Sequence, residues 1–380
     1  MANAENRFKT LQDIIDEKKL RQHIIPEGED LNYKDFGISQ YFKSYGFEVS
    51  EIWAYYFEKA NGCKSDRYVS VSLYYYYILP YLQNLNLSLA YVDKNFYGEY
   101  FKDVNQPETV LKRTNGRLYH DSAIISPEKA LSILSSHKNF IFKPSIESGS
   151  GMDILVVKED ISPENYNYLT NIILTKNGGG DFIIQKLVEQ SPVLNLLNPT
   201  SLNTVRIYTL FLPETTEPVI LGTFVRFGGK DAMVDNASLG GGFCRINHRG
   251  IIEDKIFQYR NYKERSLRNE KGISDIKIPD FDKILDLVKE LHVRLPYLNL
   301  VGWDIGIDKE NIPVLIEYNQ YPDAEFIQMG QGPMFGEYID SIMEKISDVK
   351  TTYPLVAKQK IPGLPYIHDY NFEIGRKIIL

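Results

Sequence analysis

One stretch of the sequence, residues 301–319 (VGWDIGIDKENIPVLIEYN), most constrains the fold. Residues 300–307 alternate and are rich in β-branched side chains, residues 308–311 have turn chemistry, and residues 313–316 form a second apolar run. If the turn centres near residues 310 and 311, Asp304 pairs with Glu317, and Asn319 shares a face with Glu317 because side chains alternate along a strand. The sequence therefore predicts a β-hairpin that gathers three oxygen-bearing side chains.

The chemistry of these three side chains indicates a site for a hard cation. Two carboxylates and an amide oxygen, with no His or Cys nearby, suit Mg²⁺ held together with substrate phosphates better than they suit Zn²⁺. Asp304, Glu317 and Asn319 are therefore candidate metal ligands. The alternative is a hairpin whose acidic residues simply face water, since such residues are common in hairpins and short motifs mislead.

Composition limits the class of protein. The 380 residues are enough for two or three domains, and 43% hydrophobic with 24% charged residues is typical of a globular chain. A net charge of -7 and a pI near 5.5 exclude a nucleic-acid binder that depends mainly on electrostatics. Cys63 and Cys244 form no metal or disulfide pattern, and we expect both to be buried. No signal peptide or membrane span is indicated, so we expect a soluble cytoplasmic protein.

Periodicity and turn residues predict an α+β protein of several domains. We expect a mainly helical N-terminal region (residues 1–92), then residues 93–184 and 185–348, and a tail (349–380). The predicted helices open at Ser126-Pro127 or span residues 163–175, 280–295 and 334–346. The predicted strands span residues 140–142, 154–157, 182–184, 204–212, 218–227 and 243–247.

A glycine-rich loop and a lysine suggest phosphate binding. The loop contains Ser148, Gly149, Ser150 and Gly151, whose backbone N–H groups can approach an anion closely. It is not a Walker A loop, because no Lys-Ser or Lys-Thr follows and it joins two strands. Lys143 ends the strand before this loop, where its amine would lie beside the loop. The alternative for Lys143 is an ordinary surface lysine.

Two arginines lie within apolar strands, Arg206 in TVRIY and Arg226 in FVRF. An arginine in such a position needs an anionic partner, and its planar guanidinium suits phosphate or carboxylate. A ligand is one possible partner and a core carboxylate is the other. No nucleophile elbow or histidine triad supports a hydrolase.

In chain order these motifs resemble the ATP-grasp superfamily, in particular its branch associated with sugar transfer and polysaccharides, over roughly residues 90–345. The motifs are Asp93-Lys94-Asn95, Phe142-Lys143-Pro144 with SGSG, Ile184-Gln185-Lys186-Leu187, Asn203-Thr204-Val205-Arg206, Asn236 with Gly240-Gly241-Gly242, Trp303-Asp304 and Glu317-Tyr318-Asn319. An aspartate followed thirteen residues later by a glutamate and two later by an asparagine is the most specific of them.

This resemblance implies an ATP-grasp fold, with two α+β subdomains that grip ATP, and it assigns roles to the candidate residues. Lys94 and Lys143 would contact the ATP phosphates under the SGSG loop, which would close as a lid. The hinge strand Gln185-Lys186-Leu187 would meet adenine, and Glu189 or Glu147 would bind ribose. Arg206, Arg226 and Asn319 would lie near the transferred phosphate. Asp304, Glu317 and Asn319 would hold Mg²⁺.

The activity implied is that of a Mg²⁺- and ATP-dependent carboxylate–amine ligase. It would form an acyl phosphate on a sugar-acid or amino-acid substrate in polysaccharide modification, with a small-molecule or glycan carboxylate and an amine as substrates. Phosphoryl transfer depends on positioning and charge neutralisation, which fits a site without a dedicated nucleophile. The alternatives are a phosphotransferase acting on a hydroxyl and a nucleotide-binding protein without turnover. The sequence does not indicate the oligomeric state.

Overall fold

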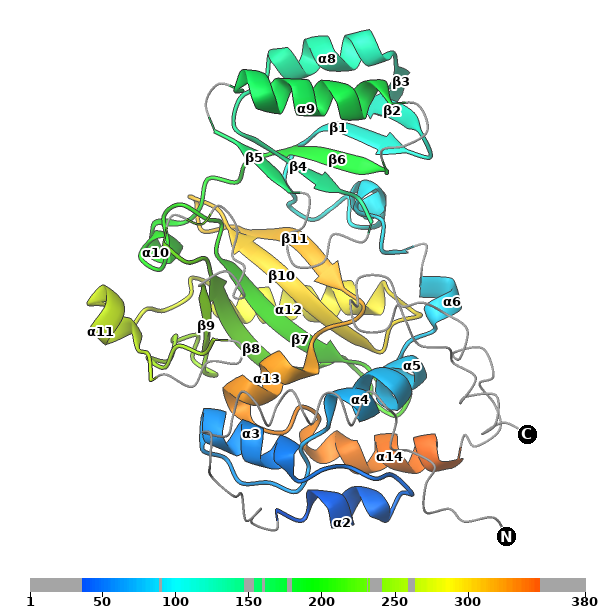
Figure 1. The fold of residues 1–380 in the computed structure, drawn as a ribbon, viewed down its shortest axis with the longest axis vertical. Helices are drawn as coiled ribbons and strands as arrows, with labels where there is room; N and C mark the ends of the chain where they lie inside the picture. Colours follow the sequence, from blue (N-terminus) through cyan, green and yellow to red (C-terminus); the bar gives the residue numbers. More distant parts are fainter. Residues whose placement is uncertain are drawn as a thin grey trace.

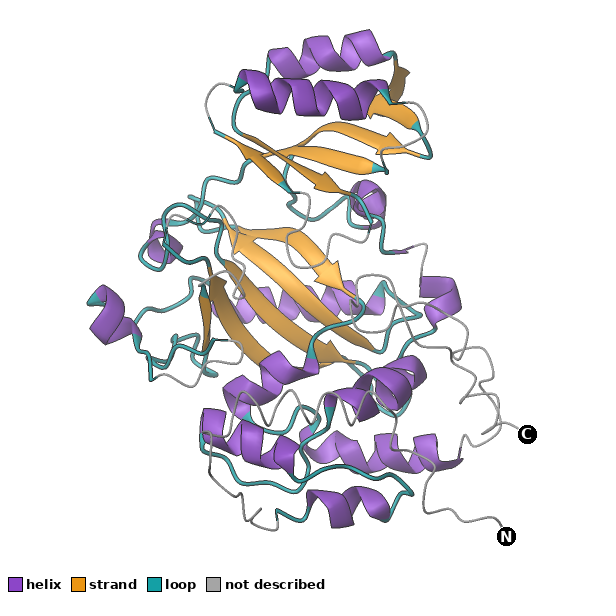
Figure 2. Cartoon of the chain, in the orientation of Figure 1, coloured by secondary structure: helices purple, strands orange, loops and turns teal. Residues whose placement is uncertain are grey.

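The protein has two β-sheets stacked one above the other, with helices at both ends (Figures 1 and 2). The computed structural model describes residues 36–88, 91–146, 154–158, 161–175, 180–230, 232, 241–258 and 264–348. Both sheets are antiparallel throughout. The architecture is α+β, as predicted from the sequence.

The helices occur mainly before the first sheet and after the second. They are α2 (Ile38–Lys43), α3 (Ile52–Asn61), α4 (Val71–Leu73), η2 (Tyr74–Ile78), α5 (Leu79–Leu82), α6 (Leu85–Ser88), η4 (Lys94–Phe96), α7 (Tyr97–Tyr100), α8 (Pro127–Ser135), α9 (Pro163–Leu174), α10 (Pro192–Asn195), α11 (Leu267–Lys271), α12 (Phe281–Val293), α13 (Ala324–Gln331), η7 (Gly336–Tyr338) and α14 (Ile339–Asp348).

The strands divide between the two sheets in the order of the chain. They are β1 (Thr109–Thr114), β2 (Arg117–His120), β3 (Ala123–Ile125), β4 (Phe140–Pro144), β5 (Leu155–Val157), β6 (Phe182–Lys186), β7 (Thr204–Leu210), β8 (Val219–Phe227), β9 (Gly242–Arg245), β10 (Leu300–Ile307) and β11 (Pro313–Asn319).

The upper sheet has the order β3-β2-β1-β6-β4-β5, and α8 and α9 cover one of its faces (Figure 1). Both helices begin as the sequence predicts. Ser126 and Ser162 accept hydrogen bonds from the N–H groups of Lys129 and Asn165, and a proline follows each cap. The strand β6 extends to Lys186, so it crosses the boundary expected between residues 184 and 185.

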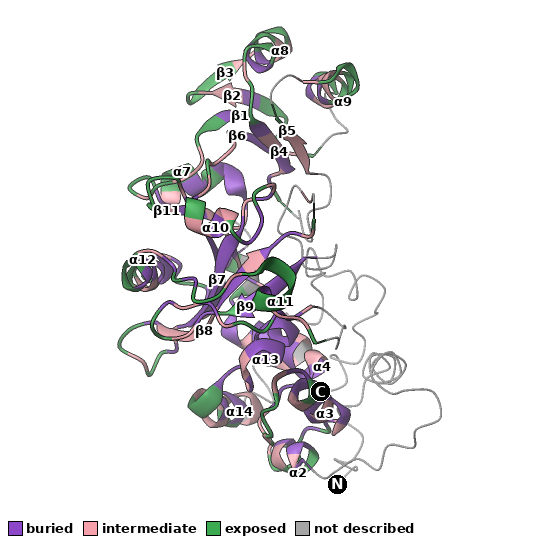
Figure 3. Ribbon diagram, turned by 90° about the vertical axis from the view of Figure 1, so that its left-hand side faces the viewer, coloured by how far each residue is buried: buried purple, intermediate pink, exposed green. Residues whose placement is uncertain are grey.

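The lower sheet has the order β11-β10-β7-β8-β9, and its two faces contribute to different cores. Ile207 and Trp303 pack with α12, whereas Tyr208 and Phe224 pack with the N-terminal helices, α13 and α14. Figure 3 shows how these helices are arranged about the sheet. Side chains alternate along a strand, which explains why consecutive residues of β7 enter opposite cores.

The N-terminal region is helical where the structure describes it, as predicted. Its four consecutive tyrosines form the π-helix η2 inside a continuous helical segment from Val71 to Leu82. One detail was wrong: Cys244 is buried, but Cys63 is exposed, because it follows the end of α3 at Gly62. None of the helices in the described part of the chain has the length and apolar character needed to span a bilayer.

The helix α13 was not predicted from the sequence. Its polar residues Glu325, Gln328 and Gln331 recur at helical spacing, although Glu325 and Gln328 are buried and so do not form a solvent-facing stripe. A second local signal is Asp323, whose Oδ1 accepts hydrogen bonds from the N–H groups of Glu325 and Phe326.

Candidate functional site

The predicted hairpin forms with the predicted register. Asp304 of β10 pairs with Glu317 of β11, and Gly302 pairs with Asn319. A register shift follows Asp304, so that Ile305 pairs with Leu315. The turn is closed by Asp308, whose Oδ1 accepts hydrogen bonds from the N–H groups of Glu310 (3.0 Å) and Ile312 (2.8 Å).

The three predicted metal ligands lie together at the centre of this hairpin. Asn319 donates a hydrogen bond from Nδ2 to Asp304 Oδ2 at 3.3 Å. Asp304 is 5% exposed, whereas the Glu317 side chain is 30% exposed. The hairpin therefore presents one buried and one accessible carboxylate, and its acids do not simply face water.

Both predicted arginines contact the buried carboxylate. Arg206, opposite Asp304 in the β7–β10 pairing, donates from Nε to Oδ1 at 2.6 Å and from Nη2 to Oδ2 at 2.7 Å. Arg226 donates from Nη1 to the same two oxygens at 3.3 and 3.4 Å. Burial alone would raise the pKa of Asp304, but the two guanidinium groups outweigh burial and hold the pKa below its usual value.

The two predicted lysines lie in the upper part of the molecule and join the same charged cluster through Glu317. Lys94 lies in η4, where its N–H donates to Ser145 O at 3.0 Å, and its Nζ forms an ion pair with Glu317 Oε1 at 3.1 Å. Lys143 of β4 is 6% exposed, and the described residues give its amine no hydrogen bond or ion pair. Burial lowers the pKa of Lys143 to about 8, and Lys94 also lowers it, while Glu317 opposes the shift.

The charges of this cluster are unbalanced among the described residues. Four cations (Lys94, Lys143, Arg206 and Arg226) face two carboxylates (Asp304 and Glu317), which leaves two positive charges in excess. Buried cations in excess favour an anionic ligand with several charges, such as a polyphosphate.

The donor set also fits a magnesium ion that arrives with such a ligand. Asp304, Glu317 and Asn319 offer only oxygen donors, as Mg²⁺ prefers. In the described ranges, no group of three or more His, Cys, Asp or Glu side chains gathers to hold a metal. These three residues would therefore need further oxygen ligands, which phosphates and water supply.

The residues predicted to meet the nucleoside lie at the end of β6 and directly after it. Gln185 is buried and donates from Nε2 to Pro107 O at 3.3 Å, and exposed Lys186 pairs with Glu108. The N–H groups of Lys186 and Leu187 are bonded to Glu108 O and Asn139 O, so an adenine contact would need other backbone groups of this segment.

Glu189 is exposed and forms an ion pair with Lys309 at 2.7 Å, and it does not join the charged cluster. Five other residues lie outside the described part of the chain, so the structure gives no position for the loop or for the alternative ribose ligand. They are Glu147, Ser148, Gly149, Ser150 and Gly151.

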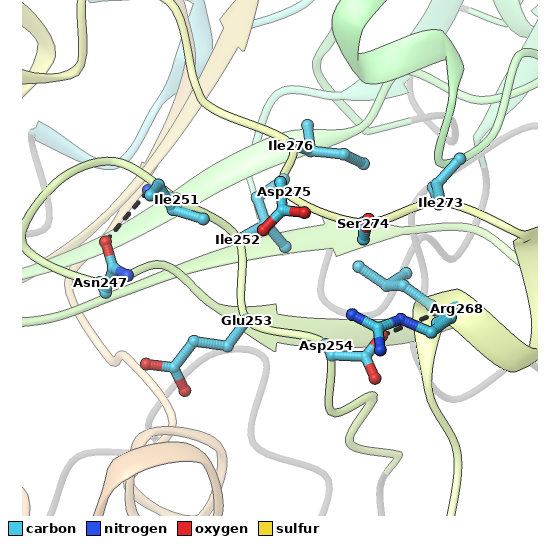
Figure 4. Close-up of a pocket in the computed structure, with 11 residues that line it drawn as sticks. Asn247, Ile251, Ile252, Glu253, Asp254, Arg268, Ile273, Ser274, Asp275 and Ile276 are labelled. Carbon is cyan, nitrogen blue, oxygen red and sulfur yellow. Dashed lines mark hydrogen bonds between the residues drawn. The ribbon is translucent and has the colours of Figure 1, made fainter.

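Tyr208 is a residue of the site that the sequence reasoning missed. The Arg206 guanidinium lies 6.0 Å from the centre of the Tyr208 ring. The period of two along β7 was the available signal, because residues 206 and 208 share a face. A pocket elsewhere, lined by residues including Asn247, Asp254 and Arg268, contains none of the predicted residues (Figure 4).

Comparison with known proteins assigns a family. The model of the sugar-transfer associated ATP-grasp family matches residues 88–343, which is more than half of the chain and confirms the resemblance stated from the sequence. This match also agrees with the ATP-grasp fold and with the expected cofactors, ATP and Mg²⁺. No curated protein matches the chain.

Three similar solved structures illustrate how far the likeness extends. The ATP-grasp ligase PsnB with its minimal precursor is 14% identical, with a TM-score of 0.38, over 69% of this chain and 64% of that one. Biotin carboxylase from Campylobacter jejuni is 12% identical, with a TM-score of 0.39, over 67% of this chain and 46% of that one. L-amino acid ligase from Bacillus licheniformis is 12% identical, with a TM-score of 0.32, over 60% of this chain and 40% of that one. The chain spans less than two thirds of the length of each of these structures.

Proposed function

Because the chain belongs to the sugar-transfer associated ATP-grasp family, we propose that it is a Mg²⁺- and ATP-dependent ligase that joins a carboxylate to an amine. The observation that supports this proposal most is the charged cluster in which four cations face two carboxylates. Such a cluster can bind and orient a polyphosphate, which is the main requirement of phosphoryl transfer.

We assign each side chain of the charged cluster a role from its position. Lys143, whose amine has no protein partner among the described residues, would bind the phosphates together with Lys94. Asp304, Glu317 and Asn319 would hold Mg²⁺, which neutralises phosphate charge when it is bound. Arg226 is more exposed than Arg206 and farther from Asp304, so it is the better placed to turn toward a transferred phosphate.

The proposed reaction has two steps. A carboxylate oxygen of the substrate attacks the γ-phosphorus of ATP, the bond to the β–γ bridging oxygen breaks, and ADP leaves. The amine then attacks the acyl carbon, phosphate departs with the former carboxylate oxygen, and the amine loses a proton to solvent. The guanidinium groups would stabilise the charge that develops on the phosphoryl oxygens, and exclusion of water would protect the acyl phosphate.

The family description supports a proposal for the substrate class. We propose a sugar acid or an amino acid as the carboxylate, in the modification of a polysaccharide, since the family is described as associated with sugar transfer. We propose that this reaction takes place in the cytoplasm, where ATP is available.

The proposal is tested by release of ADP in the presence of a panel of carboxylates, with and without amines. A ligase releases ADP and phosphate, and hydroxylamine converts its acyl phosphate to a hydroxamate. A phosphotransferase would leave phosphate on a hydroxyl acceptor, and a binding protein would show no turnover. Asp304→Asn and Glu317→Gln are the inactive controls. A full panel without stimulated ADP release would refute the ligase.

A further inference from the structure

The two carboxylates of the proposed metal site have cationic partners within the protein. Glu317 Oε1 forms an ion pair with Lys94 Nζ at 3.1 Å. Both oxygens of Asp304 accept hydrogen bonds from Arg206, at 2.6 and 2.7 Å, and from Arg226, at 3.3 and 3.4 Å. A divalent cation that approached these carboxylates without an anion would therefore meet several positive charges, and Coulomb repulsion would oppose its binding.

The cations on the two carboxylates differ in how firmly their geometry holds them. Arg206 is buried and its planar guanidinium donates two parallel hydrogen bonds to Asp304, an arrangement that fixes both side chains. Lys94 places a compact ammonium, carried on a flexible four-carbon stem, against the partly exposed side chain of Glu317. Exchange of Lys94 for another partner therefore disturbs the site less than exchange of Arg206.

The backbone around Lys94 is bound to the upper sheet. The N–H of Lys94 donates to Ser145 O at 3.0 Å, directly after β4, and Asn95 Nδ2 donates to Arg113 O of β1 at 2.7 Å. Glu317 instead belongs to β11, the edge strand of the lower sheet that lies nearest to the upper sheet (Figure 1). The ion pair therefore joins the two sheets through side chains, and the Lys94 amine can leave Glu317 by side-chain rotation alone.

We propose that the ion pair between Lys94 and Glu317 makes metal binding depend on a polyphosphate. Phosphate oxygens accept the ammonium of Lys94 in place of Glu317, and the released carboxylate then binds the Mg²⁺ that the phosphates also ligate. Mg²⁺ alone offers Lys94 no acceptor, so it must displace the ammonium without compensation. This inference rests on the proposed function and adds an order of binding to it: the metal enters with the nucleotide or after it.

The test measures the binding of Mn²⁺, which takes the same oxygen ligands as Mg²⁺ and whose free ion is detected by electron paramagnetic resonance. The wild type and Lys94→Met are each titrated with Mn²⁺ alone and again with saturating ADP. We expect Lys94→Met to bind Mn²⁺ alone about tenfold more tightly than the wild type, the effect of one hydrogen bond to a charged group. ADP should correspondingly strengthen Mn²⁺ binding about tenfold less in Lys94→Met than in the wild type.

Lys143→Met is the matched control, because it removes a buried cation from the same cluster that has no ion pair with Glu317. Its gain in affinity for Mn²⁺ alone should be smaller, since Coulomb energy falls with distance. Adding Glu317→Gln to Lys94→Met should abolish the gain, which assigns it to this site. Lys94→Gln, which also removes the charge, repeats the comparison if Lys94→Met does not fold.

The outcomes separate this inference from the proposed function. Equal affinities for Mn²⁺ alone in the wild type and the Lys94 variants, or equal gains in Lys94→Met and Lys143→Met, would overturn the inference and leave the proposed function standing. A wild type that binds no Mn²⁺ in the presence of ADP would contradict the proposed function, and this inference would fail with it.

Discussion

The ion pair between Arg206 and Asp304 gives the sharpest prediction about the stability of the site. Arg206→Met keeps similar bulk and removes the charge, whereas Asp304→Asn keeps the shape of the carboxylate and removes its charge. In each single variant, the remaining charged side chain of the pair stays buried without this partner. In the double variant, neither charge of the pair remains.

The size of the effect follows from the burial and geometry of the pair. Both side chains are about nine-tenths buried and joined by two short hydrogen bonds. Removing one partner of such a pair costs about 3–5 kcal/mol. Arg226, at 3.3 Å from the same carboxylate, remains as a partner for Asp304, so we expect Arg206→Met to cost about 3 kcal/mol, near the lower limit of that range.

Urea unfolding of the wild type, the two single variants and the double variant measures the coupling. We expect the double variant to lose about 2 kcal/mol less than the sum of the single losses, as residues in direct contact do. Additive losses would refute the reasoning, because they would mean that the two side chains do not interact in solution.

Three further predictions concern single groups. Because the pKa of Lys143 is near 8, its amine loses its charge as the pH rises from about 7 to 9, and the affinity for ADP should fall over that range. Calorimetry at several pH values measures this change, and Lys143→Arg should make the affinity for ADP less dependent on pH. Burial lowers the pKa of His292 from 6.5 to about 4, so its contribution to stability is complete above pH 6.5 and disappears as the pH falls toward 4. That loss is about 3 kcal/mol at about 1.4 kcal/mol per pH unit, and urea unfolding of His292→Gln should show a correspondingly weaker pH dependence. Ser162→Ala removes the cap of α9 and should lower the free energy of unfolding by about 1 kcal/mol in the same assay.

The hairpin could be predicted in detail because its information is local. A turn with Asp308 and Asn311 sets the register, and the register places Asp304 opposite Glu317. The sequence allowed two kinds of partner for Arg206, a ligand or a core carboxylate, and the structure shows a carboxylate. No sequence pattern indicated that this carboxylate belongs to Asp304, which is also the predicted metal ligand.

The contacts of Tyr74 could not be predicted because they join residues that are distant in the sequence. Tyr74 and its hydrogen-bond partner Pro322 are 248 residues apart in the sequence. The spacing of apolar residues predicted a helix over residues 52–60, but it did not indicate which face of the lower sheet the N-terminal helices cover.

The most direct test of the account is the dependence of ADP binding on Mg²⁺, measured by calorimetry. We predict that Mg²⁺ strengthens ADP binding to the wild type and that Glu317→Gln loses this dependence, because Glu317 is the accessible carboxylate of the hairpin. Glu310→Gln, an exposed acid in the turn of the same hairpin, should behave like the wild type. No binding of ADP with Mg²⁺, or an unchanged Mg²⁺ dependence in Glu317→Gln, would contradict the assignment of this hairpin as the nucleotide–metal site.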